Sequence, residues 1–240
     1  MIYCDIHTHQ PTRRRREDMA IISVNVCDPH NPIGASSVDR SLSGYAGGSG
    51  CFDEFYSVGI HPWAPDREQM KRVVEYAAFP SVVAIGETGL DRVSAKNSLD
   101  FDRQRDVFSA HIHLSEKVGK PLIIHCVKAW DVLLHIRKIE KPVMPWIIHG
   151  FGGKEALAVR LLDAGLFLSF GAGRSRVGAL EVARNSHRLL AETDDSDADI
   201  RDVYRCIAGQ LGISVYELSR EISGSLSILF PPWRDASLMR

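Results

Sequence analysis

The segment PLIIHCVKAWDVLLHI, residues 121–136, holds the pattern that decides the fold. It opens with the apolar run Leu122–Ile124, continues with the polar residue His125, and passes into Ala129–Ile139, where apolar residues recur with a helical period. A short, unalternating run rich in Leu and Ile is typical of a strand buried in a parallel sheet. The segment therefore predicts a buried strand with a polar end, followed by a helix.

The same order of elements recurs along the chain. Helical periodicity is also found in Phe101–Val118, Glu155–Leu162 and Val203–Leu211. Seven further apolar runs are Ile2–Ile6, Ala20–Val26, Phe55–Ile60, Val82–Ile85, Trp146–Ile148, Leu166–Phe170 and Leu189–Ala191. Strands that alternate with helices predict βαβ units and an α/β fold. Eight such runs favour a closed (β/α)8 TIM-like barrel over an open sheet.

The length of the chain agrees with this fold. A (β/α)8 barrel typically needs about 250 residues, and the chain has 240. No internal repeat or linker is visible, so residues 1–240 are expected to form a single domain. The first two βα crossovers are expected to be irregular, because about a dozen residues separate the first two runs, and because a Gly/Ser-rich stretch with GYAGGSG lies between Asp28 and Glu54.

Composition excludes several classes of protein. The formal net charge of -1 excludes a globally basic nucleic-acid binder, although a local basic patch is compatible with it. The five cysteines are scattered and form no CxxC pair, which is typical of reduced thiols in a cytoplasmic protein. The N-terminal residues show no signal peptide, and no apolar run approaches the ~18 residues of a membrane helix.

Metal-binding residue types gather at the ends of the predicted strands. Histidine and carboxylate are the ligands that Zn²⁺, Mn²⁺ and related ions prefer. The polar strand-end residues, in chain order, are Asp5, His7, His9, His61, Glu87, His125, His149 and Asp194. In an extended strand, His7 and His9 share one face and can hold one ion. Because barrel active sites lie at the carboxyl ends of the strands, these residues are expected to converge there, with enough ligands for two ions.

Other histidines of the chain lack this context. His111 and His113 form a second HxH, but on a predicted helix, where positions i and i+2 do not share a face. They are interpreted as packing or surface residues. A single histidine among His61, His125 and His149 would also be more simply explained by packing. The whole set is harder to explain so, because burying many polar groups without partners is costly.

With these motifs in place, the chain resembles the TatD-related metal-dependent hydrolases, or TatD DNases, of the amidohydrolase superfamily. The segments that carry the resemblance are DIHTH (Asp5–His9), GIHPW (Gly59–Trp63), IGETGLD (Ile85–Asp91), PLIIHC (Pro121–Cys126), IIHGF (Ile147–Phe151) and AETD (Ala191–Asp194). They stand in the family's order, and ISVYELSREISGSLSILF near the end of the chain resembles its closing helices.

The resemblance implies a role for each ligand. It implies that His7, His9 and Asp194 bind a first divalent ion and that Glu87 bridges it to a second. His125 and His149 would bind the second ion. Asp194 would also orient or deprotonate the attacking water, and His61 would contact a phosphoryl oxygen of the substrate. The histidines favour Zn²⁺, and the mixed set also accepts Mn²⁺, Ni²⁺ or Mg²⁺.

The expected reaction is hydrolysis of a phosphodiester, with DNA ends or single strands as substrate. Two alternatives remain: hydrolysis of an amide, ester or lactone by the same site, and a non-catalytic metal-binding protein. The family often has an arginine close after the fifth-strand histidine, whereas this chain has Val127-Lys128. The run Arg13, Arg14, Arg15 and Arg16 is either a solvated loop or supplies one or two guanidinium groups to a substrate phosphate. Neither the oligomeric state nor the natural substrate follows from the sequence.

Overall fold

The computed structural model describes residues 3–10, 18–27, 55–173 and 175–230. The chain divides into two compact units, one of Ile21–Trp146 and one of Met1–Ala20 with Ile147–Arg240. A single domain over residues 1–240 stays a prediction. Among the described residues, no helix is both long and apolar enough to cross a membrane.

The unit Ile21–Trp146 is built on four parallel strands in its described part. They are β2 (Met19–Asn25), β3 (Phe55–Gly59), β4 (Val82–Asp91) and β5 (Leu122–Val127), paired in chain order. In register, Val58 faces Ile85 and Thr88 faces Ile124. These strands are buried almost throughout, which is why they appear in the sequence as unalternating apolar runs.

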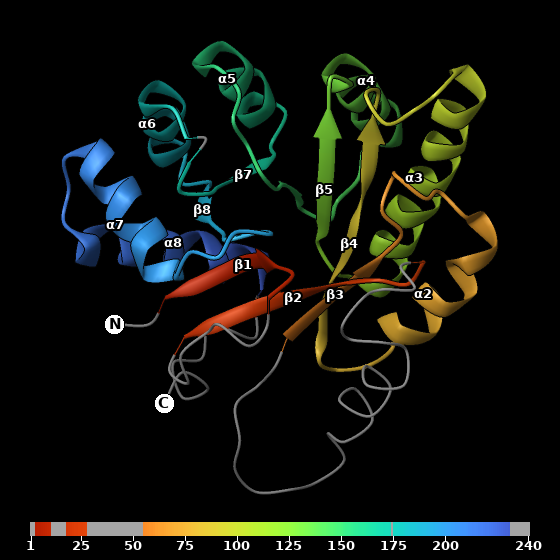
Figure 1. Ribbon diagram of the computed structural model, residues 1–240, viewed down its shortest axis with the longest axis horizontal. Helices are drawn as coiled ribbons and strands as arrows, with labels where there is room; N and C mark the ends of the chain where they lie inside the picture. Colours follow the sequence, from red (N-terminus) through yellow and green to blue (C-terminus); the bar gives the residue numbers. More distant parts are fainter. Residues whose placement is uncertain (1–2, 11–17, 28–54, 174, 231–240) are drawn as a thin grey trace, which may run out of the picture. The chain divides into compact units, whose positions relative to one another are not determined.

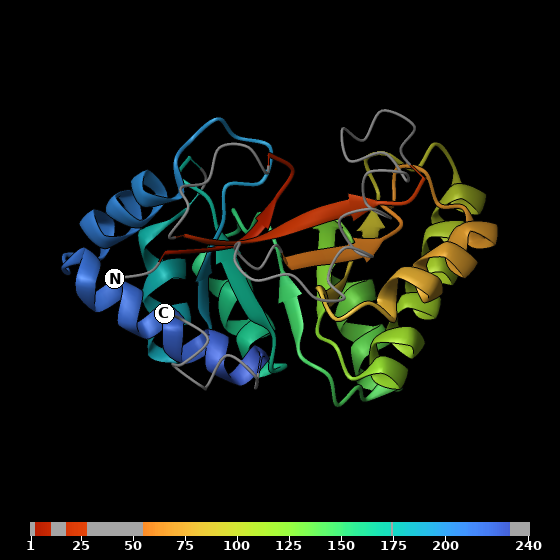
Figure 2. The ribbon, with the colours of Figure 1, turned by 90° about the horizontal axis from the view of Figure 1, so that it is seen from below.

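The helices of this unit lie along its strands. They are η2 (Arg67–Gln69), α2 (Met70–Ala77), α3 (Ser98–Val118) and α4 (Trp130–Glu140), drawn from orange to green in Figure 1. Helix α3 packs on β4 and runs beside it in Figure 2. It begins where the side chain of Asn97 accepts a hydrogen bond from the Asp100 amide, and it ends at Gly119 in the left-handed conformation.

The other unit has the same alternation. Its strands are β6 (Trp146–Ile148), β7 (Phe167–Phe170), β8 (Leu189–Ala191) and β1 (Cys4–Thr8). Strands β6, β7 and β8 pair in parallel, and β1 joins beyond β8 through a parallel bridge between Thr8 and Asp194. The helices are α5 (Glu155–Asp163), α6 (Val177–Asn185), α7 (Ile200–Leu211) and α8 (Val215–Leu229).

Helix α7 fixes the start of β1. The Tyr204 hydroxyl donates to the Cys4 carbonyl and accepts from the Cys4 amide, both at 3.2 Å. Further along the chain, the buried Asp18 accepts two hydrogen bonds from the guanidinium of Arg201, at 3.0 and 3.1 Å. The two Tyr204 hydrogen bonds therefore attach the strand that carries His7 to helix α7.

All eight predicted apolar runs overlap strands of the described residues, and the four predicted helices begin and end within three residues of the observed ones. Helices α2 and α6 were not predicted from the sequence. The irregular first two crossovers, with Arg13–Arg16 and the GYAGGSG stretch, lie outside the described residues.

The prediction that Glu87 and His125 directly follow their strands is wrong in detail. Strand β4 continues from Val82 to Asp91 and β5 from Leu122 to Val127, so both side chains lie inside strands. Gly86 and Gly89 interrupt the apolar pattern of β4, so the second half of this strand was not predicted from the sequence. A Cβ at Gly89 would stand 2.0 Å from the His125 carbonyl oxygen, so β4 and β5 can approach here only because this residue is glycine.

Candidate metal centre

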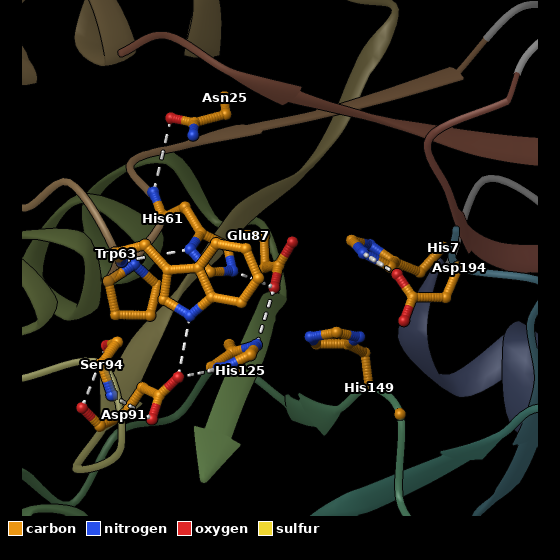
Figure 3. A network of polar contacts seen from close by, with 12 residues as sticks. His7, Asn25, His61, Trp63, Glu87, Asp91, Ser94, His125, His149 and Asp194 are labelled. Carbon is orange, nitrogen blue, oxygen red and sulfur yellow. Dashed lines mark hydrogen bonds and ion pairs between the residues drawn. The ribbon is translucent and has the colours of Figure 1, made fainter. Parts of the chain in front are cut away.

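Glu87 lies between two histidines in the unit Ile21–Trp146. The Oε1 atom of Glu87 is 3.0 Å from His61 Nε2 and 3.0 Å from His125 Nδ1 (Figure 3). The two imidazole rings meet edge to face with centroids 4.7 Å apart. All three side chains are largely buried, and Glu87 itself is 2% exposed. One carboxylate oxygen is thus shared by two imidazoles in a poorly hydrated place.

The backbone around β3 brings His61 to this position. A Cβ at Gly59 would stand 2.4 Å from the Glu87 carbonyl oxygen, so only glycine permits this approach of β3 and β4. Beyond Gly59, the Ile60 amide donates to His111 Nε2 at 3.1 Å, and the His61 amide donates to Asn25 Oδ1 at 3.4 Å. The turn after β3 is therefore held from helix α3 and from strand β2.

Hydrogen bonding indicates the tautomer of His61. The Trp63 amide donates to His61 Nδ1 at 3.1 Å, which makes Nδ1 an acceptor. The proton of a neutral ring then sits on Nε2 and is donated to Glu87 Oε1. A cation that binds Glu87 would compete with this hydrogen bond, so His61 either joins the ligands or turns its N–H to another acceptor.

Asp91, at the end of β4, supports His125 from the other side. Its Oδ2 atom is 3.3 Å from His125 Nε2 and accepts a 2.8 Å hydrogen bond from Trp63 Nε1. Its Oδ1 atom accepts from the amides of Val93 and Ser94. Burial raises the pKa of Asp91, but the hydrogen bonds from Trp63, Ser94 and Val93 outweigh it and leave the pKa below its ordinary value. A charged carboxylate on the second nitrogen of a histidine orients the ring for metal binding.

A second group of ligand atoms lies in the other unit. Asp194 Oδ1 is 3.7 Å from His7 Nε2 (Figure 3). It is also 3.7 Å from His9 Nε2, and the rings of His7 and His9 meet edge to face at 4.9 Å. Because His7 and His9 are two positions apart at the end of β1, they face the same side. His7 is fully buried, whereas His9 and Asp194 are about one third exposed. The group can therefore be reached by water on the side of Asp194.

His149 and Glu192 extend this group. The ring of His149 lies 4.4 Å from that of His7, and its Nδ1 atom is 3.8 Å from Glu192 Oε1. Glu192 is 0% exposed, follows β8 directly, and accepts a hydrogen bond from the Gly150 amide. Ligand atoms of His149, Glu192 and Asp194 all lie within 4.8 Å of one another. Glu192 was not among the residues predicted from the sequence.

Asp5 positions this group without being one of its ligands. Its carboxylate accepts hydrogen bonds from the His7 amide and from both the amide and the hydroxyl of Thr193. It therefore joins β1 to the segment that carries Asp194. Burial raises the pKa of Asp5 to about 7, against the opposing effect of the Thr193 hydrogen bonds.

The donor atoms of both groups fit divalent cations. Two ligands at ~2.1 Å from one ion lie no more than ~4.2 Å apart. The carboxylate oxygens of Glu87 and Asp194 lie 3.0 to 3.7 Å from the nitrogens of their two histidines. In each of these groups the three ligand atoms lie within 4.8 Å of one another. Imidazole and carboxylate are the donors that Zn²⁺ and Mn²⁺ accept.

Comparison with known proteins identifies the family of this chain. Residues 43–227 match the model of the TatD related DNase family. The chain belongs to this family. It is 30% identical over 199 residues to the uncharacterized metal-dependent hydrolase YcfH of Escherichia coli K12, an alignment that covers 73% of each chain. It is 32% identical over 158 residues to the 3'-5' ssDNA/RNA exonuclease TatD of Klebsiella pneumoniae, covering 61% of this chain and 57% of that one.

A solved TatD structure has the same fold. The crystal structure of YjjV, a TatD homologue from Escherichia coli K12, superposes with a TM-score of 0.71 over 95% of this chain and 98% of its own, at 19% sequence identity. The predicted (β/α)8 barrel is therefore confirmed. The resemblance inferred from DIHTH, GIHPW and the four other segments is confirmed as well.

The structure also places the histidines that the sequence had set aside. His111 is fully buried in α3 and bonded to the backbone at both ring nitrogens, and His113 is exposed and lies 3.3 Å from Glu140. The interpretation of these two as packing and surface residues is confirmed. Among the described residues, the sequence reasoning missed Glu192 and the supporting role of Asp91. Glu192 follows the run Leu189–Ala191 directly, so the strand-end criterion itself could have found it.

Proposed function

We propose that this protein is a metal-dependent phosphodiesterase that hydrolyses nucleic acid at ends or in single strands. The observation that carries the proposal is the pair of donor groups, His7–His9–Asp194 and His61–Glu87–His125, each with three ligand atoms within 4.8 Å. They occur in a member of the TatD related DNase family. The name of the Klebsiella relative, a single-strand exonuclease, supports the choice of substrate.

We propose that two divalent ions are held by six residues. These residues are His7, His9, Glu87, His125, His149 and Asp194. Support for a joint site comes from the fold, because the carboxyl ends of all barrel strands share one face. A bound ion would polarise a phosphoryl oxygen and acidify water near neutral pH. Zn²⁺ suits the histidine-rich set, and Mn²⁺, Ni²⁺ or Mg²⁺ are the other candidates.

The protein's own residues then have distinct tasks. Asp194 is the proposed general base, since its carboxylate is about one third exposed and can accept a proton from water. His61 carries a proton on Nε2 and is proposed to donate it to a phosphoryl oxygen once Glu87 binds a cation. Asp91 keeps the ring of His125 in place through its Oδ2 atom.

Elemental analysis followed by a substrate panel tests the proposal. The purified protein is analysed for Zn, Mn, Ni and Mg, stripped with a chelator, and reloaded with each metal in turn. Single-stranded, duplex and 3'- or 5'-blocked DNA are compared with a carboxylic ester, an amide and a lactone. We expect metal-dependent cleavage of single strands from an end. Turnover of the carboxylic compounds alone would establish the rival hydrolase, and no turnover with metal bound would indicate a non-catalytic protein.

Two further expectations concern substrate binding and location. A phosphate clamp by one or two of Arg13–Arg16 stays a prediction, because these residues lie outside the described ones. A single Arg→Ala variant that removes one phosphate interaction should reduce the log–log salt slope of single-strand binding by about 0.7.

A cytoplasmic location also remains a proposal, supported by Cys4, Cys27, Cys126 and Cys206, which are free thiols in the described part of the chain.

A further inference from the structure

Trp63 is an exposed aromatic residue that is nevertheless fixed in orientation. It is 68% exposed, although large apolar side chains are normally buried. Its indole N–H donates a 2.8 Å hydrogen bond to Asp91, and its ring packs edge to face with His61 at 4.7 Å and with His125 at 6.2 Å. Figure 3 shows the indole over Asp91, His61 and His125. An exposed ring held by a buried carboxylate is suited to receive another flat group.

A cavity lies beside this ring. Its volume is about 410 Å³, which is within the size range of small-molecule sites. Its walls come mainly from three segments of the unit: the turn after β3, the segment that follows β4 and the start of α3. The lining includes Cys27, Pro62, Trp63, Ser94, Lys96 and Gln104.

Gln104 holds the walls of this cavity together. Its side-chain amide donates to the carbonyl of Pro62, the carbonyl of Asp91 and the hydroxyl of Ser94, at 3.0 to 3.2 Å. Its Oε1 atom accepts from the Asp91 amide at 2.8 Å. Gln104 is 2% exposed, so these bonds are shielded from water. The cavity is therefore preformed by a buried network rather than left by loose loops.

The charges around the cavity favour an uncharged ring over a free anion. Among the lining residues, Lys96 and Arg103 are offset by Asp66 and Asp100. Arg103 lies 3.4 Å from Asp100, so its charge is already compensated. The lining residues that the structure describes are formally neutral in sum, and the one large aromatic surface among them is Trp63. A nucleobase, which is flat, polar at its edge and uncharged, fits such a place.

We propose that this cavity is a nucleobase subsite and that Trp63 stacks on an unpaired base of the substrate strand. The proposal rests on the proposed nuclease function. Asp91 connects the subsite to the chemistry, because its Oδ2 atom contacts both Trp63 and His125. A base in a duplex has its faces covered by its neighbours, whereas a base in a single strand offers a free face. The subsite thus selects single strands without selecting a sequence.

Binding of abasic oligonucleotides tests the subsite. A fluorescent single-stranded DNA is compared with a series in which one abasic residue is moved stepwise from the 3' end, using Asp194→Asn protein to slow turnover. Stacking on an aromatic residue contributes roughly 5- to 150-fold per base. We expect one abasic position to weaken binding by such a factor. Adding Trp63→Ala should weaken binding of the intact strand similarly and abolish the effect of that abasic position.

Two further variants separate stacking from other effects. Trp63→Phe keeps an aromatic face but loses the hydrogen bond to Asp91, and it should retain most of the abasic effect. Tyr216→Ala removes an exposed aromatic residue, 63% accessible, that does not line the cavity, and should bind like the parent protein. If Trp63→Ala weakens binding of intact and abasic strands alike, the indole acts through Asp91, and the proposal of a nucleobase subsite is refuted.

Hydrolysis by the wild-type protein distinguishes the two proposals. If wild type cleaves the intact strand but Trp63→Ala binds every oligonucleotide with unchanged affinity, the subsite is overturned while the proposed function stands. If wild type neither binds nor cleaves any nucleic acid, both proposals are overturned. The affinity for duplex DNA should be the same with and without the Trp63→Ala substitution, because duplex bases are not free to stack.

Discussion

Asp194 is joined to His7 through both backbone and side chain. The Asp194 amide donates to the His7 carbonyl at 2.9 Å, and the Asp194 carboxylate lies 3.7 Å from His7 Nε2. The carbonyl of Asp194 in turn accepts from the His9 amide at 3.2 Å. Asp194 has a φ of 55°, a left-handed conformation that is uncommon outside glycine but is adopted more often by Asp and Asn than by most residues. The two hydrogen bonds to the β1 segment hold the residue in this conformation and fix the direction of its carboxylate.

Asp194→Asn should separate the proposed base from the fold. The amide side chain is of similar size and suits a left-handed backbone, so folding and much of the metal should be retained. Turnover should fall by about 10²-fold or more, in the range of general-base loss. The measurement is metal-saturated kcat on single-stranded DNA beside thermal unfolding. Asp195→Asn, next in the chain, is the matched control, and unchanged kcat in Asp194→Asn would refute the assigned role.

Glu87→Gln should weaken metal binding strongly. Residues that only orient metal ligands contribute roughly 10- to 100-fold in affinity, so removal of a ligating carboxylate should reduce affinity by at least about 100-fold. The glutamine can still hydrogen-bond to His61 and His125, which limits the effect on folding. Metal affinity is measured by titration of the stripped protein. Glu140→Gln, a carboxylate of α4 beside His113, is the control, and equal affinities for the two variants would contradict the role of Glu87.

Glu192→Gln tests whether Glu192, which was not among the predicted ligands, contributes to metal affinity. Glu192 is 0% exposed, and its Oε2 atom has no hydrogen-bond partner among the described residues. A buried carboxylate oxygen without a partner is costly unless a cation or a proton neutralises it. Glutamine keeps an acceptor for the Gly150 amide but has no charge. We expect lower metal affinity with little loss of stability, whereas unchanged affinity in the titration would assign Glu192 to holding Gly150 alone.

The sequence predicted the strands well because burial on both faces leaves apolar runs with clear ends. It predicted the ligand types because His125, His149 and their counterparts interrupt or end those runs. It did not predict the supporting contacts, since the partners are far apart in the chain: Trp63 and Asp91 are separated by 28 residues. Only the fold brings such pairs together, and no local pattern marks them.

The second half of β4 shows a further limit. The run Val82–Ile85 ends at Gly86, and glycine normally weakens or interrupts a strand. Here Gly86 and Gly89 continue the strand because each faces a close neighbour on β5, where a Cβ would stand 2.4 Å from the Ile123 carbonyl oxygen or 2.0 Å from that of His125. The sequence contains the glycines, but their meaning depends on the neighbouring strand.

His111 links helix α3 to the turn that carries His61. Its Nδ1 atom lies 2.8 Å from the Val107 carbonyl, to which it donates, and its Nε2 atom accepts from the Ile60 amide. This arrangement requires a neutral ring. Burial lowers the pKa of His111 to about 4, and the charge of Arg67 contributes in the same direction.

The stability of the fold should therefore depend on pH through His111. Between the unfolded pKa of ~6.5 and the folded value of about 4, the unfolded chain binds more protons, so stability is complete above pH 6.5 and is lost as the pH falls towards 4. The loss should be on the order of 3 kcal/mol. His111→Gln can keep both hydrogen bonds but cannot titrate. The unfolding free energy of wild type minus that of the variant should therefore decrease as the pH is lowered through this window. His113→Gln, an exposed histidine two residues away, should show a constant difference. Both variants should leave metal content unchanged, and parallel pH curves for wild type and His111→Gln in urea unfolding would refute the role of His111.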